Sequence, residues 1–261
     1  MEERNINSDE IKRSIVSLAS TTYAKVAEIS EISNLLDNFL AKNPQNVTVA
    51  IYYLQTLVML GKANDAINLA ESIWNIGGSI TKETEALYIY LLNSLCMFNY
   101  SKVLLEPKLK IEFSEQQKYP NLISLFITCY TGIGDLNALN EITKLNGISN
   151  RQKQILKGFV TQMTADGARE HFIWQQKKIN EVIYKKCSAY EVLLSADNGY
   201  PEIEIGVFAG GDSVDRYQLQ RNVDKVYNDY YEIVGYTPLD NFMLTVYDIK
   251  EHWGYDGTID D

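Results

Sequence analysis

The sequence predicts a mainly α-helical protein in which a helix-hairpin array precedes a small module of ββαβ order. The first observation is the stretch 44–78, where two amphipathic helical patterns are separated by Gly61. The second is that turn positions recur around this stretch at intervals of 34, 37 and 36 residues. The third is a change after Cys187, where the apolar period shortens from that of a helix to that of a strand.

The helices of the array follow from apolar residues three and four positions apart. This spacing predicts helices over 11–27, 32–41, 47–60, 63–76, 82–98, 100–105, 120–132 and 135–146. Asn43-Pro44 ends the second helix because proline cannot continue a helical hydrogen-bond ladder. Ser149 and Gln152 form a capping box that begins another helix, and a further helix reaches Lys186.

The spacing of these hairpins resembles that of the tetratricopeptide (TPR) repeat family over residues 11–147. The turn positions are Ala27, Gly61, Phe98 and Gly134, and Pro44 falls where the family's closing proline belongs. The tryptophan that the family carries on its first helix is missing, as is the Lys/Asn ladder that binds C-terminal carboxylates. The alternative is a non-repeating α-helical domain that uses similar hairpins.

The resemblance implies that the first helix of each hairpin lines a concave surface. Carried over residue by residue, this surface includes Tyr52, Gln55, Met59 and Tyr88. Such a surface would suit an apolar or amphipathic helix, including one from this chain. The alternative for each of these side chains is that it belongs to the core between helices.

The C-terminal part is predicted to contain two strands, a helix and a third strand. Strands over 190–195 and 202–209 flank the turn signal Asp197-Asn198-Gly199. A helix over 213–234 and a strand over 241–249 follow. A module of about 70 residues is near the lower limit for a self-sufficient core, so we expect it to pack against the helical array.

These elements divide the chain into four predicted regions. They are an array over 8–147, capping and connecting helices over 148–187, a small acidic α/β domain over 188–254 and an acidic tail over 255–261.

Charge is divided unevenly along the chain. From Cys187 onward there are fifteen acidic and four basic residues, a net charge of −11, whereas the first 186 residues carry +1. Nine of the eighteen tyrosines also lie in this last segment. An acidic, tyrosine-rich surface repels phosphate backbones and attracts basic surfaces. We therefore expect a basic protein partner and no direct nucleic-acid binding.

The sequence indicates a cytoplasmic protein without membrane contact. Its first residues, MEERNINSDEIKR, lack the cationic and apolar regions of a leader, and no apolar run is long enough for a span. Cys96, Cys129 and Cys187 are far apart and fall in apolar patterns, which is typical of free buried thiols in a reducing compartment.

One short motif could carry chemistry. Asp248-Ile249-Lys250 on a strand resembles the acid-x-lysine motif of Mg²⁺-dependent PD-(D/E)xK nucleases, with Glu204 or Asp240 as the second acid. The alternative is a solvated strand edge. Neither histidine has metal-ligand spacing, and Gly210-Gly211 lacks the phosphate-loop pattern, so we expect no metal and no cofactor.

The leading hypothesis is a non-enzymatic scaffold for protein–protein interaction, with an immunity, antitoxin, chaperone or adaptor role. In the C-terminal module the expected partner-binding residues are Glu204, Asp212, Asp215, Tyr217, Tyr227 and Tyr231. The alternatives are a Mg²⁺-dependent nuclease centred on Asp248 and Lys250, and a regulator whose array senses a peptide. The sequence leaves the oligomeric state open.

Overall fold

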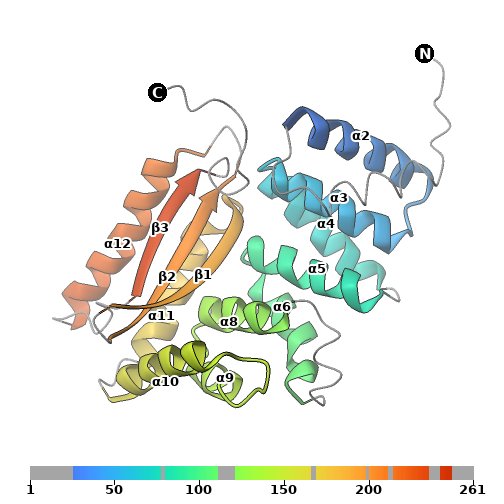
Figure 1. Ribbon diagram of the computed structural model, residues 1–261. Coiled ribbons are helices and arrows are strands. Elements are labelled where there is room, and N and C mark those ends of the chain that lie inside the picture. The colour runs from blue at the N-terminus through green and yellow to red at the C-terminus, as the bar shows by residue number, and fades with distance from the viewer. Residues whose placement is uncertain are drawn as a thin grey trace.

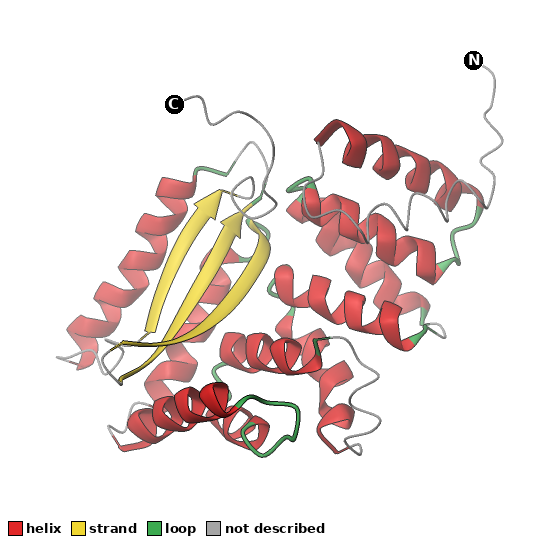
Figure 2. Cartoon of the chain, viewed as in Figure 1, coloured by secondary structure: helices red, strands yellow, loops and turns green. Residues whose placement is uncertain are grey.

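The structure, a computed structural model, describes residues 26–77, 80–110, 121–165, 169–197, 200–210, 214–234 and 242–248 of the 261-residue chain. These residues form a mainly α-helical protein with a three-stranded sheet in its C-terminal part (Figure 1, Figure 2). The helices are α2 (Val26–Lys42), α3 (Val47–Met59), α4 (Ala63–Ile76), α5 (Lys82–Ser94), α6 (Phe98–Leu105), η1 (Glu106–Lys110), α8 (Leu122–Ile133), α9 (Leu136–Ile142), α10 (Asn150–Ala165), α11 (Arg169–Ile183) and α12 (Arg216–Val234). The strands are β1 (Cys187–Asp197), β2 (Tyr200–Ala209) and β3 (Phe242–Asp248).

Three adjacent helix pairs, α3–α4, α5–α6 and α8–α9, share one turn geometry. Each turn contains a residue with positive φ: Gly61 (69°), Cys96 (59°) and Gly134 (77°). In each turn the next residue donates its N–H to the carbonyl oxygen five residues back, namely Lys62 to Leu57 (2.9 Å), Met97 to Leu92 (2.8 Å) and Asp135 to Tyr130 (2.9 Å). These are the hydrogen bonds of a Schellman-type helix end, so the same local structure recurs at intervals of 35 and 38 residues.

Two predicted turn positions are wrong. Ala27 lies inside α2, because no glycine or proline interrupts the helix-forming residues 26–31. Phe98 is the first residue of α6, and the turn before it is at Cys96. Left-handed backbone costs a non-glycine residue about 1–2 kcal/mol, so turns of this kind are expected at glycine. A cysteine therefore gives no signal in the sequence that position 96 is a turn residue. The predicted helix over 11–27 lies almost entirely outside the described residues.

Several predicted elements are confirmed. Helix α4 has the predicted bounds, and the capping box at the start of α10 is formed. The N–H of Gln152 donates to Ser149 Oγ at 3.2 Å, and the N–H of Ser149 donates to Gln152 Oε1 at 3.1 Å. The ββαβ order of the C-terminal part is also confirmed. No helix in the described ranges is long and apolar enough to cross a membrane.

The strands lie in the order β1-β2-β3. Strand β1 pairs with β2 in antiparallel register, and β2 pairs with β3 in parallel register. A parallel pair needs a crossover connection, and α12 lies within the one between β2 and β3. Figure 1 shows α12 running alongside β3, with α10 and α11 also next to the sheet.

One face of the sheet is buried against helices. Alternate residues of the three strands, Tyr190, Ile203, Ile205, Val207, Leu244 and Val246, are at most 8% exposed. They belong to one apolar cluster with buried residues of α5, α6, α8, α9, α10, α11 and α12. On the other face, Leu193 is 56% exposed and Tyr247 is 38% exposed. The sheet therefore shares its core with the helical part instead of enclosing one of its own.

The β3 backbone is hydrogen-bonded by a side chain of α12. Gln220 Oε1 accepts from the N–H of Val246 at 2.7 Å, and Gln220 Nε2 donates to the carbonyl of Leu244 at 3.5 Å. One primary amide thus pairs with β3 much as the peptide group of a neighbouring strand would. Unpaired strand edges invite pairing with other chains, so Gln220 protects this strand.

We expect Gln220→Ala to lower the free energy of unfolding by about 1 kcal/mol, because the N–H of Val246 loses its acceptor. Thermal melts monitored by circular dichroism will measure this loss, and sedimentation velocity will show whether the exposed edge promotes self-association. Gln218→Ala is the matched control, since Gln218 is exposed on the same helix and donates to Asn222. Equal stability of the two variants would contradict the assignment.

Candidate functional site

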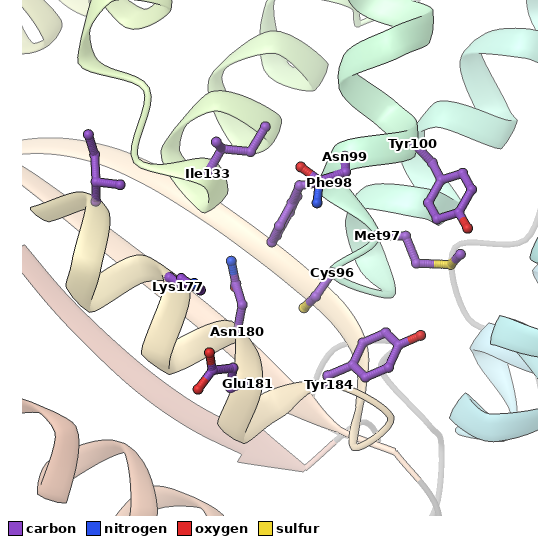
Figure 3. A pocket seen from close by; sticks show the side chains of 11 residues that line it. Cys96, Met97, Phe98, Asn99, Tyr100, Ile133, Lys177, Asn180, Glu181 and Tyr184 are labelled. Atoms are coloured by element: carbon purple, nitrogen blue, oxygen red, sulfur yellow. The ribbon is translucent and has the colours of Figure 1, made fainter.

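A cavity of about 690 Å³ lies between α11 and the turn that joins α5 to α6 (Figure 3). One wall is formed by the consecutive residues Cys96–Tyr100. The opposite wall comes from α11, and Ile133 at the end of α8 contributes between them. We call this cavity the α11 groove.

The α11 wall is a single stripe of side chains. Ile173, Lys177, Asn180, Glu181 and Tyr184 recur at spacings of three and four residues, which places them on one side of the helix and its following turn. At 1.5 Å per residue the stripe is about 16 Å long. Its two apolar ends are open to solvent, since Ile173 is 42% exposed and Tyr184 is 39% exposed.

The opposite wall is held by aromatic contacts. The Phe98 ring meets the Tyr190 ring edge-on at a centroid distance of 4.9 Å. A Cβ added to Gly132 would lie 2.5 Å from Phe98 Cζ, so the ring occupies space that only glycine leaves free. The Tyr100 ring contacts Trp74 edge-on at 5.0 Å. This wall is therefore positioned by β1, α8 and α4 together.

Polar residues also line the groove. Asn180 Nδ2 donates to the carbonyl oxygen of Gly132 at 2.8 Å, whereas Asn180 Oδ1 is buried and has no hydrogen-bond partner among the described residues. Lys177 and Glu181 are exposed. A hydrogen bond from Lys178 holds the pKa of the Glu181 carboxyl below its usual value. The groove thus offers an apolar surface and one charge of each sign.

Two buried thiols meet beside the groove. Cys187 Sγ lies 3.4 Å from the carbonyl oxygen of Ser94, two residues before Cys96. Burial, and after it the neighbouring Cys187, raises the pKa of the Cys96 thiol well above its usual value. The third cysteine, Cys129, is also buried and free, and burial raises the pKa of its thiol to about 12. The prediction of free, buried thiols is confirmed.

The predicted concave surface does not form an open site. Met59 is 1% exposed and Tyr88 is 3% exposed, and the Tyr88 hydroxyl donates to the carbonyl oxygen of Ala70 at 2.8 Å. These two side chains are core residues, whereas Tyr52 and Gln55 are half-buried. Helices α5 and α8 pack against β1, so this chain's own strand covers part of the side on which a partner was expected.

The predicted residues of the C-terminal module are scattered. Tyr217 and Tyr231 are 63% and 55% exposed on α12. Asp215 caps this helix, and its Oδ1 accepts from the N–H groups of Tyr217 (2.9 Å) and Gln218 (3.2 Å). Glu204 and Tyr227 are half-buried, and Asp212 lies outside the described residues. The structure does not gather these residues into the α11 groove.

The register of the sheet contradicts the pairing of Glu204 with Asp248 as metal ligands. Glu204 lies opposite Met243, whereas Asp248 lies opposite Ala209. The two acids are therefore five register positions, or about 16 Å, apart along the strands. Mg²⁺ binds its ligands at about 2 Å, so one ion cannot bridge them. Asp240 and Lys250 lie outside the described residues, and the described residues contain no group of three His, Cys, Asp or Glu that could hold a metal.

The groove residues were missed because their signal is weak. Ile173 and Tyr184 are apolar on the same side as Lys177 and Glu181, which departs from the simple amphipathic pattern. Such a departure is visible in the sequence, but only the folded chain shows that residues 96–100 lie opposite it.

Neither the scan of protein-family models nor the searches of curated proteins and solved structures found a match to this chain. We therefore infer function from the groove geometry and from the charge distribution.

Gly132→Ala tests the packing of the groove wall. The added methyl group clashes with Phe98, and overpacking of this kind costs about 1–3 kcal/mol. Alanine is favoured over glycine in a helix by only about 1 kcal/mol, so we expect a net loss of up to about 2 kcal/mol in chemical denaturation.

The double variant Gly132→Ala/Phe98→Leu is the control for this clash. A smaller side chain at position 98 relieves it, so the two substitutions together should cost less than the sum of their separate effects. Additive losses, or a more stable Gly132→Ala variant, would contradict the described packing.

Proposed function

We propose that this chain is a non-enzymatic interaction protein that holds an amphipathic helical segment of a protein partner in the α11 groove. The observation that carries this proposal is the stripe on α11, where Ile173 and Tyr184 stay exposed opposite an apolar wall. Exposed large apolar side chains that flank a concavity are typical of binding surfaces. An amphipathic helix would cover both ends of the stripe.

The shape of the groove favours a peptide segment over a compact ligand. A stripe about 16 Å long corresponds to three turns of a bound helix. Apolar side chains of the partner would contact the wall formed by residues 96–100. Lys177 and Glu181 would select partners with complementary charges on either side of the apolar stripe.

The charge distribution favours a basic partner. The chain from Cys187 onward carries a net charge of −11. On α12, Asp224, Asp229 and Glu232 are exposed together with Tyr231, and Arg221 and Lys225 are exposed on the same helix. Acids in the last turns of a helix oppose its dipole, so helix stability does not account for Asp229 and Glu232. Helix α12 packs against α11, which places these carboxylates one helix away from the groove. Carboxylates there would attract a basic partner, as an immunity protein, antitoxin, chaperone or adaptor requires.

In this proposal the helix hairpins form the rigid scaffold that carries the groove. We interpret α3–α4, α5–α6 and α8–α9 as a tetratricopeptide-like scaffold, on the grounds of their recurring turn. Five residues after the turn residue, the first two units carry the small buried residues Ala66 and Ser101, as that family does. The third unit has Leu139 there, which departs from the pattern.

The combined variant Ile173→Glu/Tyr184→Glu should lose the partner. Both substitutions put charge on an apolar contact surface, and each hot-spot residue contributes about 1–2 kcal/mol or more to binding. The measurement is capture of host-cell proteins by the immobilised chain, quantified by mass spectrometry. Val103→Glu is the matched control, because Val103 is 57% exposed and does not line the groove. Equal capture by the double variant and the wild type would refute the α11 groove as the partner-binding site.

Affinity for the captured partner should depend on salt. We expect the dissociation constant to rise at least about tenfold between about 50 mM and 500 mM NaCl, because salt screens exposed charges. In Asp229→Asn/Glu232→Gln, which removes two charges and keeps the side-chain volumes, this dependence should weaken. An affinity that does not change with salt would contradict a basic partner. Isothermal titration calorimetry measures the dissociation constants of the wild type and the variant at each salt concentration.

A further inference from the structure

Two cysteines that are far apart in the sequence meet in the folded chain. Cys96 lies in the turn between α5 and α6, and Cys187 is the first residue of β1. Burial, and after it the neighbouring Cys187 side chain, raises the pKa of the Cys96 thiol. Cys187 Sγ also lies 3.4 Å from the carbonyl oxygen of Ser94 and 2.8 Å from that of Ala189, which places it against the end of α5.

Only one of the two sulfurs adjoins the α11 groove. Cys96 lines the cavity and is 8% exposed, whereas Cys187 is 1% exposed and does not line it. Figure 3 shows the Cys96 side chain at the wall of the cavity that faces α11. A small solute in the groove would therefore meet the sulfur of Cys96 first.

A buried hydroxyl adjoins the same pair. Tyr190 is 2% exposed, and its hydroxyl has no hydrogen-bond partner in the described parts of the chain. Burial, and after it the neighbouring Cys96, Tyr227 and Cys187, raises the pKa of this hydroxyl. A free donor beside a thiol can stabilise an oxygen atom added to that sulfur or leaving it. Apolar packing of Phe98 against Tyr190 encloses this region.

We propose that Cys96 and Cys187 are a dithiol–disulfide site that a hydroperoxide oxidises through the α11 groove. The Cys96 thiolate attacks one oxygen of hydrogen peroxide and breaks the O–O bond, which yields Cys96 sulfenic acid and hydroxide. The Cys187 thiolate then attacks the sulfenic sulfur, forms the S–S bond and displaces hydroxide. The protons of the two thiols convert both hydroxides to water, so two thiols and one peroxide give one disulfide and two waters.

The disulfide has a structural consequence. It ties the turn that forms one wall of the groove to the first strand of the sheet, across 91 residues of chain. A cross-link over a long loop restricts the unfolded chain, so the oxidised protein should melt at a higher temperature. Because burial raises the pKa of the Cys96 thiol, oxidation at neutral pH should be slower than that of exposed thiols.

The test is oxidation of the full-length native chain with hydrogen peroxide. Remaining thiols are alkylated, and the protein is digested and mapped by mass spectrometry without reduction. We expect a cross-linked peptide pair that contains Cys96 and Cys187, a mass about 2 Da below that of the reduced chain, and reversal by dithiothreitol. Cys129, which is fully buried in α8, should stay reduced. Circular dichroism before and after treatment reports whether the chain stays folded.

Two variants assign the order of the steps. In Cys187→Ser, which keeps a hydrogen-bond donor at this position, Cys96 should stop at sulfenic acid and react with dimedone. Cys129→Ser should form the same disulfide as the wild type. A folded wild-type chain in which peroxide leaves Cys96 and Cys187 unlinked would overturn the proposal, whether the thiols stay reduced, join other chains or go on to sulfonic acid. The wild-type map decides this even if Cys187→Ser does not fold.

Discussion

Burial of one face of the three-stranded sheet against helices determines how the C-terminal half of the chain packs. A sheet with one apolar face must bury that face against another element, so Ile203, Ile205 and Val207 must be covered. Helices α8, α10, α11 and α12 cover them and complete one continuous core. The charge changes sign near the start of β1, but the core does not end there.

This shared core also sets the geometry of the α11 groove. Phe98 forms part of the groove wall and packs against Tyr190 of β1 and Gly132 of α8. Asn180 of the other wall is hydrogen-bonded to the backbone of Gly132. Both walls are therefore anchored to α8, and the contact of Cys187 Sγ with the carbonyl oxygen of Ser94 joins the turn of one wall to the sheet. Such a groove is preorganised, which limits the entropy lost when a partner binds.

Local signals predicted much of the fold. The bounds of α4, the capping box of Ser149 and the ββαβ order all follow from neighbouring residues, and all are confirmed. The turn at Cys96 could not be predicted, because tertiary contacts and not residue type hold its left-handed backbone. The groove could not be predicted either, since its walls are more than 70 residues apart in the sequence. Met59 and Tyr88 fit a repeat pattern, but that pattern does not distinguish a binding surface from a core.

The shared apolar cluster implies that helices α5 to α12 and the sheet unfold as one cooperative unit. Native-state hydrogen exchange in increasing denaturant tests this cooperativity, because each amide reports the free energy of the opening that exposes it. We expect the amides of Ile205 and Val207 in β2 and those of Phe126 and Tyr130 in α8 to converge on one free energy and one denaturant dependence. Exchange of the β2 amides through a separate, lower-energy opening would show that the sheet is an independent unit, and would contradict the claim.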